Sequence, residues 1–184
     1  MEPLVNAKGS ELYWVQPLTM RNNFILRSGE RIFGRLEFRS VFSSLVQAVA
    51  AHETWTFNQV GFISPRVIVR RSGSESDLAS YQPKWTGTEG QIKLSRGEVY
   101  IWRVANFWST RYAIANKDGT EIVTYQSGSD EKKISNLFKQ QARVHITLEA
   151  WQLSELPLIV MLGWYLVILH YSDSSAAAVI ATMA

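Results

Sequence analysis

A run of fourteen residues near the C-terminus, LPLIVMLGWYLVIL (156–169), sets the strongest limit on how this chain can fold. It carries no charge, and its only polar side-chain groups are the indole N–H of Trp164 and the hydroxyl of Tyr165. Its one proline, Pro157, falls in the first turn, where a helix tolerates proline. A helix that is apolar on every side must be surrounded on every side, either by protein or by lipid.

The length of the run favours protein over lipid. Fourteen helical residues span ~21 Å at ~1.5 Å per residue, whereas a bilayer core requires ~20 residues and ~30 Å. Extending the helix would add His170, Tyr171 and Asp173, and no Lys or Arg follows Arg143 to mark an orientation in a membrane. The alternative is a tail-anchored membrane protein, whose 156–169 helix spans the bilayer and whose remaining chain forms a small cytoplasmic β-domain.

Alternating apolar and polar residues, typical of half-buried strands, recur through the rest of the chain. In RIFGRLEF (31–38) the alternation places Ile32, Leu36 and Phe38 on one face. The same pattern predicts strands at 55–57, 66–70, 91–94, 98–104, 111–116, 120–125 and 143–148. Glycine-containing turns at 27–30, 95–98 and 116–119 separate them, so we expect antiparallel pairs.

Three further segments complete the outline. The alanine content of residues 41–53 favours a helix, but predicted strands lie on either side, so we expect a strand there. The serine-rich segments 72–80 and 127–133 are expected to be surface loops. A closed barrel can surround an apolar helix with its inward side chains and leaves no sheet edge exposed. The sequence therefore predicts one mainly β domain, a closed antiparallel β-barrel that encloses a hydrophobic C-terminal helix.

Composition and motifs point away from catalysis. The chain has no cysteine, which excludes disulfides, cysteine-ligated zinc and a thiol nucleophile. His52, His145 and His170 are far apart in sequence, and no metal or phosphate-loop motif is present. We expect no enzyme activity, no metal and no cofactor, and we expect His170 to interact with the carbonyl end of the helix dipole. The N-terminus lacks the basic start and apolar stretch of a secretory signal, so a cytoplasmic protein is expected.

Three blocks, in this order, resemble the tubby C-terminal-like superfamily, which includes plant LURP-one-related proteins and phospholipid scramblases. They are WTFNQVGFISPRVIVR (55–70), YQPKWTGTEGQIKLSRGEVYIWRVANFWSTRYAIANKDG (81–119) and ELPLIVMLGWYLVIL (155–169), and they are similar to small bacterial members. The resemblance implies a barrel of about 12 strands over residues 30–171, with its central helix at 155–171. Residues 1–29 would belong to the barrel or lead into it, and 172–184 would form a tail.

The resemblance implies a non-catalytic binding or scaffold module, peripheral at a membrane, whose partner is an anionic phospholipid or a membrane surface. The densest basic cluster, Arg66, Arg70 and Arg71, is the candidate lipid or phosphate site. Arg66 and Arg70 share one face of a strand, and guanidinium pairs bind phosphate well. A solvated charged face is the alternative. Scrambling activity is not expected, because the chain lacks cysteine for acylation and has too few acids after the helix for a calcium site.

Aromatic residues offer a last candidate. Trp55, Trp85, Trp102 and Trp108, interleaved with Lys84, Lys93, Arg103 and Arg111, could form a base-stacking platform for a single-stranded nucleic acid. We expect these indoles instead to fill the barrel and cover its ends. Nucleic acid is therefore not the favoured partner, and the sequence identifies no protein partner.

Overall fold

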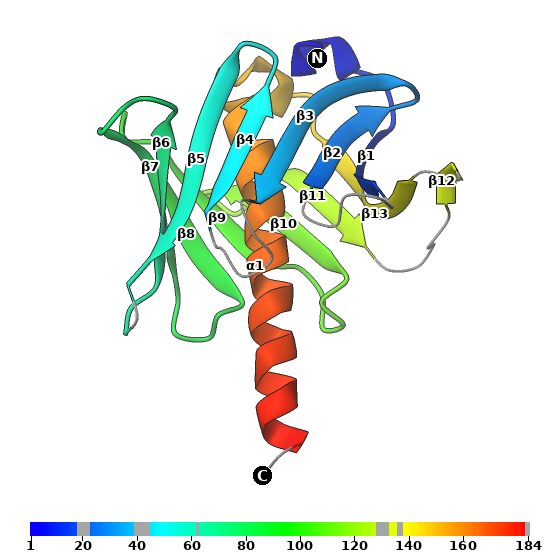
Figure 1. The fold of residues 1–184 in the computed structure, drawn as a ribbon. Helices are drawn as coiled ribbons and strands as arrows, with labels where there is room; N and C mark the ends of the chain where they lie inside the picture. Colours follow the sequence, from blue (N-terminus) through cyan, green and yellow to red (C-terminus); the bar gives the residue numbers. More distant parts are fainter. Residues whose placement is uncertain (18–22, 39–44, 62, 128–132, 136–137, 183–184) are drawn as a thin grey trace.

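The strands run up and down in sequence order around a long central helix (Figure 1). The computed structural model describes residues 1–17, 23–38, 45–61, 63–127, 133–135 and 138–182, and it describes their side chains except at 133–135, 138–140 and 173–182. The helix enters at one end of the barrel and continues out of the other, so the two ends of the barrel differ (Figure 1).

The elements follow one another with short connections. The strands are β1 (Leu12–Pro17), β2 (Asn23–Ser28), β3 (Arg31–Phe38), β4 (Val46–Ala50), β5 (Glu53–Val60), β6 (Arg66–Arg71), β7 (Asp77–Pro83), β8 (Glu89–Leu94), β9 (Val99–Val104), β10 (Arg111–Asn116), β11 (Glu121–Ser127), β12 (Lys133–Ser135) and β13 (Phe138–Ile146). Two short 3-10 helices, η1 (Leu4–Ala7) and η2 (Ala150–Gln152), precede β1 and the long helix α1 (Leu156–Thr182).

Pairing of the first and last long strands closes the barrel. β1 runs antiparallel to β13, with Leu12 opposite Val144 and Pro17 opposite Phe138. Twelve strands form the closed barrel, because β12 pairs only with β13. The predicted closed barrel is thereby confirmed, and the N-terminal residues 1–29 supply two of its strands, β1 and β2.

The first three turns of α1 fill the barrel. Ile159, Val160, Leu162, Tyr165 and Val167 are fully buried although they point in different directions around the helix axis. This burial confirms that the apolar run lies inside the barrel. Within the described residues, no helix is both long enough and apolar enough to span a membrane.

Close contacts and hydrogen bonds fix the helix against the wall. A Cβ on Gly163 would lie 2.6 Å from Ile114 Cδ1 and closer still to the Tyr125 hydroxyl, so only glycine fits there. The Tyr125 hydroxyl donates to the Val160 carbonyl (3.0 Å), and the Trp102 indole donates to the Gly163 carbonyl (3.3 Å). Both barrel side chains bind backbone carbonyls of the helix, which fixes its rotation and its depth.

The sequence located most strands but misjudged several boundaries. The segment 72–80 is not a loop throughout, because β7 begins at Asp77; its serines masked the alternation of inward Ala79 and Tyr81. The strand expected within 41–53 is confirmed as β4, although 41–44 lie outside the described residues, as do 128–132 of the second expected loop. The strand expected at 143–148 ends at Ile146.

The helix is also longer than predicted. It continues through the eleven residues 172–182, so most of the expected tail is helical. The prediction that His170 interacts with the carbonyl end of the helix is therefore wrong, because His170 lies twelve residues before the last helical residue, Thr182. Its ring instead packs near Trp102 and Tyr112, with centroids 6.0 and 5.8 Å away.

Burial of the helix can be tested with Leu162→Asp. A carboxylate at this fully buried position has no partner, and the substitution should cost about 4 kcal/mol or more, against a total stability of ~5–15 kcal/mol. Urea unfolding followed by circular dichroism should show a severely destabilised or unfolded protein. Leu148→Asp, at a position that is 70% exposed, is the matched control and should unfold like the wild type. Equal unfolding midpoints for both variants would contradict an enclosed helix.

Candidate functional site

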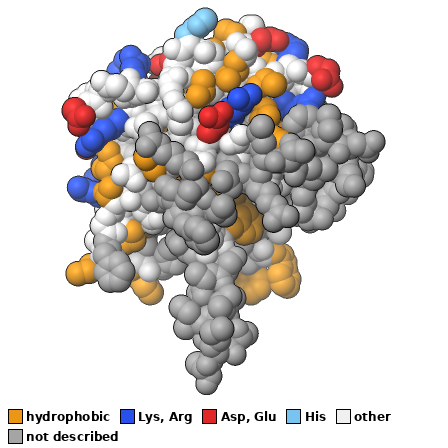
Figure 2. All heavy atoms as spheres, in the orientation of Figure 1, with side chains coloured by type: hydrophobic (Ala, Val, Ile, Leu, Met, Phe, Trp, Pro, Cys, Tyr) orange, Lys and Arg blue, Asp and Glu red, His pale blue; other side chains and the backbone are white. Residues whose placement is uncertain are grey.

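The end of the barrel from which α1 emerges carries exposed apolar side chains. We call this end the exit rim and define it by the β5–β6, β7–β8 and β9–β10 loops. Ile63 (96% exposed), Trp85 (97%), Phe107 (90%) and Trp108 (78%) project from these three loops. Figure 2 shows apolar side chains projecting at this end, whereas the acidic side chains visible in that view lie on the half away from the emerging helix.

Aromatic exposure distinguishes the exit rim from the opposite end. In the part of the chain that the structure describes, the exposed large aromatic side chains are Trp85, Phe107 and Trp108 of the exit rim and Tyr171, which lies where α1 leaves the barrel. The exposed apolar side chains of the opposite end are the aliphatic Met1, Val5 and Leu148. The exit rim is therefore the candidate binding surface.

The β9–β10 loop holds its two aromatic rings in place through its own hydrogen bonds. The Asn106 Oδ1 accepts from the backbone N–H groups of Thr110 (2.9 Å) and Arg111 (3.0 Å). Between these anchors the Phe107 and Trp108 rings pack edge to face, with centroids 5.2 Å apart. The rings are thus exposed on an ordered loop, and the loop pays little conformational entropy when they contact a partner.

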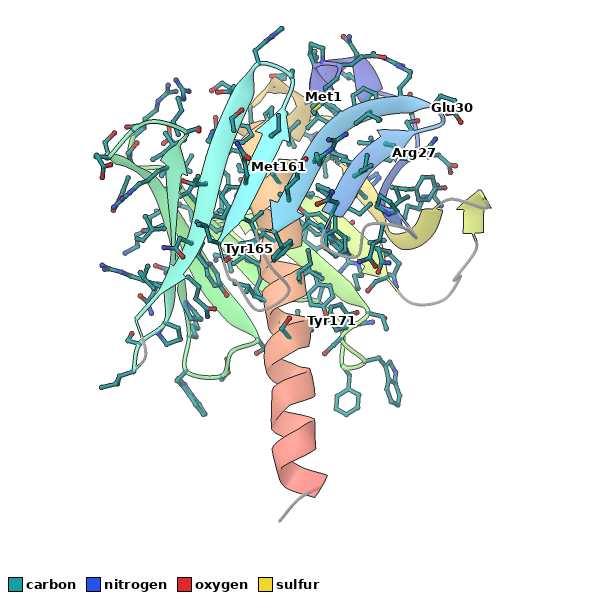
Figure 3. All side chains as sticks on the ribbon, in the orientation of Figure 1. Met1, Arg27, Glu30, Met161, Tyr165 and Tyr171 are labelled. Atoms are coloured by element: carbon teal, nitrogen blue, oxygen red, sulfur yellow. The ribbon has the colours of Figure 1, made fainter. Side chains whose placement is uncertain are left out.

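Tyr171 links this loop to the helix. Its hydroxyl donates to the Ser109 carbonyl (3.2 Å) and lies 2.9 Å from the Ser127 hydroxyl. The hydroxyl of Tyr112, on β10, also donates to the Ser109 carbonyl (2.8 Å). Figure 3 places Tyr171 where the helix leaves the barrel, below Met161 and Tyr165. Loop, wall and helix therefore form one connected unit at the exit rim.

A cleft of about 490 Å³ opens at the exit rim, between α1 and the strands β5, β6, β7 and β9. Leu166 and Leu169 of the helix and Trp102 of β9 supply apolar walls, and Ile63 and Trp85 contribute from the loops. The volume lies in the range typical of small-molecule sites. No carboxylate is among the described residues that line it. The cleft therefore combines apolar walls with an absence of negative charge.

Two of the polar side chains that line the cleft, Gln59 and Tyr81, belong to one cross-strand row. Gln59 of β5 lies opposite Val67 of β6, and Val67 lies opposite Tyr81 of β7. Tyr81 is only 6% exposed, yet its hydroxyl has no hydrogen-bond partner among the described residues, and the same holds for the Gln59 amide. Burial, together with the Glu89 carboxylate, raises the pKa of Tyr81, so its hydroxyl stays protonated and available as a donor.

The predicted arginine cluster is divided between the two ends of the barrel. Arg66 begins β6 at the exit rim and lines the cleft, and it forms no ion pair with any described residue. Arg70 and Arg71 end β6 at least ~13 Å away along the strand. Arg70 pairs with Asp77 (2.8 Å) and Arg71 with Glu53 (3.0 Å), so their charges are largely neutralised. Only Arg66 joins the candidate site.

The four tryptophans considered as a stacking platform are likewise separated. Trp55 and Trp102 are buried in the barrel, as expected, but Trp85 and Trp108 are exposed rather than covering its ends. The sequence did not identify Ile63 or Phe107 as site residues. They could have been recognised because each is a large apolar residue in a loop between two predicted strands, where small or polar turn residues are usual. Loops carry function more often than the strands they connect.

Other site chemistry is not apparent in the described part of the chain, which contains no group of three or more His, Asp or Glu side chains able to hold a metal ion. No protein-family model, no curated protein and no solved structure matches the chain. The resemblance to the tubby C-terminal-like superfamily therefore stays a prediction, and the function must be inferred from the site itself.

Exposure of the exit-rim indoles can be checked by fluorescence quenching. Acrylamide reaches exposed indoles, so the double variant Trp85→Phe/Trp108→Phe should lose most of the quenchable emission of the wild type. Trp151→Phe, at the opposite end and only half-buried, is the control and should leave most of that emission in place. A quenching curve that the double variant shares with the wild type would show that the two rings are covered.

Proposed function

We propose that this protein is a non-catalytic binding module that docks its exit rim on an anionic membrane surface. The observation that carries the proposal is the exposure of Ile63, Trp85, Phe107 and Trp108 on three loops at one end of a barrel. Indole rings favour the membrane–water interface, where the apolar ring body and the polar N–H are both accommodated. Separate projecting tips suit a deformable bilayer better than they suit a flat, rigid protein surface.

Apolar contacts supply most of the expected binding energy. One aromatic side chain has ~200 Å² of surface, so inserting half of it removes ~100 Å² from water and is worth ~2.5 kcal/mol. A basic residue near an anionic membrane contributes ~1 kcal/mol, and this attraction decays over ~8 Å at physiological salt. The aromatic tips therefore outweigh Arg66, and binding should persist at moderate salt.

The direction of α1 agrees with docking at this end. The helix passes the exit rim and continues for eleven more residues toward the side on which the membrane would lie (Figure 1). Residues 173–184 carry a single charge, on Asp173. The 156–169 run meanwhile fills the barrel, so docking requires no membrane span by that run.

Liposome flotation tests this proposal. Phe107→Ala/Trp108→Ala should reduce partitioning onto anionic vesicles by about 70-fold or more, because each ring is worth ~2.5 kcal/mol. Arg66→Ala should reduce it by about fivefold, corresponding to ~1 kcal/mol. The matched controls are Arg70→Ala/Arg71→Ala, with ion-paired arginines at the opposite end, and Leu148→Ala, an exposed apolar side chain there; both should float like the wild type.

Two results would contradict the proposal. One is a failure of the wild type to float with anionic vesicles, and the other is equal loss of flotation in the exit-rim variant and the Leu148→Ala control. A strict dependence on Arg70 and Arg71 would instead assign binding to the charged strand end that the sequence suggested.

A further inference from the structure

We infer that the exit-rim cleft binds a single phospholipid molecule, with its phosphate head group between Arg66 and the Tyr81 hydroxyl and its apolar part against the helix. The inference rests on the proposed function, because a docked exit rim would bring the cleft to the membrane surface. It goes beyond docking by assigning a stoichiometric site for one lipid. The cleft offers such a lipid unpaired donors, apolar walls and a positive charge.

Unpaired donors are the first reason. Tyr81 is only 6% exposed and lines the cleft, and its hydroxyl has no hydrogen-bond partner among the described residues. Gln59, in the same cross-strand row, also keeps its amide unpaired. Both side chains can donate to a ligand in the cleft, and a ligand with several acceptor oxygens would accept from both.

Spacing and charge favour a phosphate head group. Gln59 and Tyr81 lie two strand spacings apart, ~10 Å between their Cα atoms, so a head group with several oxygens suits them better than a small ion. Arg66 lines the cleft where β6 begins, and its planar guanidinium binds phosphate through paired donors. Lys84 also lines the cleft, although it pairs with Glu89.

Apolar walls favour a lipid over free phosphate. Leu166, Leu169, Val67 and Trp102 form the interior of the cleft, and Trp85 stands at its loop side. Free phosphate would leave these side chains uncovered, whereas acyl chains would bury them. The cleft is thus amphiphilic in the same sense as a phospholipid, with a cation and donors beside an apolar wall.

The test uses a soluble short-chain phosphatidate below its micelle concentration, titrated into the full-length protein by calorimetry. We expect saturable binding at one site per chain. Tyr81→Phe should weaken the affinity by about tenfold or more, as for a hydrogen bond to a charged group, and Gln59→Leu should weaken it as well. Neither variant should unfold the barrel, because neither side chain has a partner to lose; thermal melts check this. Inorganic phosphate, titrated alone, should not bind detectably.

A second variant separates this inference from the docking proposal. Phe107 and Trp108 do not line the cleft, so Phe107→Ala/Trp108→Ala should bind the monomeric phosphatidate like the wild type while losing vesicle flotation. Loss of flotation in all proteins, with phosphatidate binding intact, would overturn docking alone. Equal phosphatidate affinity in the wild type and Tyr81→Phe, or equally tight binding of inorganic phosphate, would overturn the lipid site.

Discussion

Enclosure of an all-apolar helix is the constraint on which the rest of this structure depends. A helix that rests on one face of a sheet needs only one apolar stripe, but residues from Leu156 to Val167 present apolar groups in every direction. A closed barrel satisfies this requirement and gives each of its twelve strands a neighbour on both sides. The short strand β12, which is not part of the closed barrel, pairs with β13 alone. The barrel in turn needs the helix, because twelve strands enclose more space than their own side chains fill.

Polar contacts inside this apolar core determine where the functional end lies. The Tyr125 and Trp102 side chains donate to carbonyls of the helix, and Gly163 lets the wall approach closely. Apolar packing alone would allow the helix to slide or rotate, whereas these directional bonds define one position. Because the helix is fixed, His170 and Tyr171 reach the rim, where Tyr171 joins the β9–β10 loop to the helix.

The two ends of the barrel then differ in kind. At the end where the helix enters, several arginines are paired with acids, as Arg71 is with Glu53, and such exposed ion pairs are ordinary on a solvated surface. At the exit rim the loops carry exposed aromatic rings, Arg66 has no ion pair among the described residues, and a cleft reaches the helix. Large exposed apolar surfaces on a folded protein usually mark a binding site. This difference between the two ends is the basis for proposing membrane docking at the exit rim only.

Local patterns in the sequence by themselves determined the fold class: the alternation of residues such as those of 31–38 identified strands, and the apolar run at 156–169 required an enclosure. They did not determine the site. Alternation shows which residues share a face of a strand, so it placed Arg66 and Arg70 together, but it does not show which end of the barrel each occupies or which acid lies beside it. Only the tertiary structure decided that Asp77 neutralises Arg70 and that Gln59 and Tyr81 share a row, because cross-strand register brings together residues far apart in sequence.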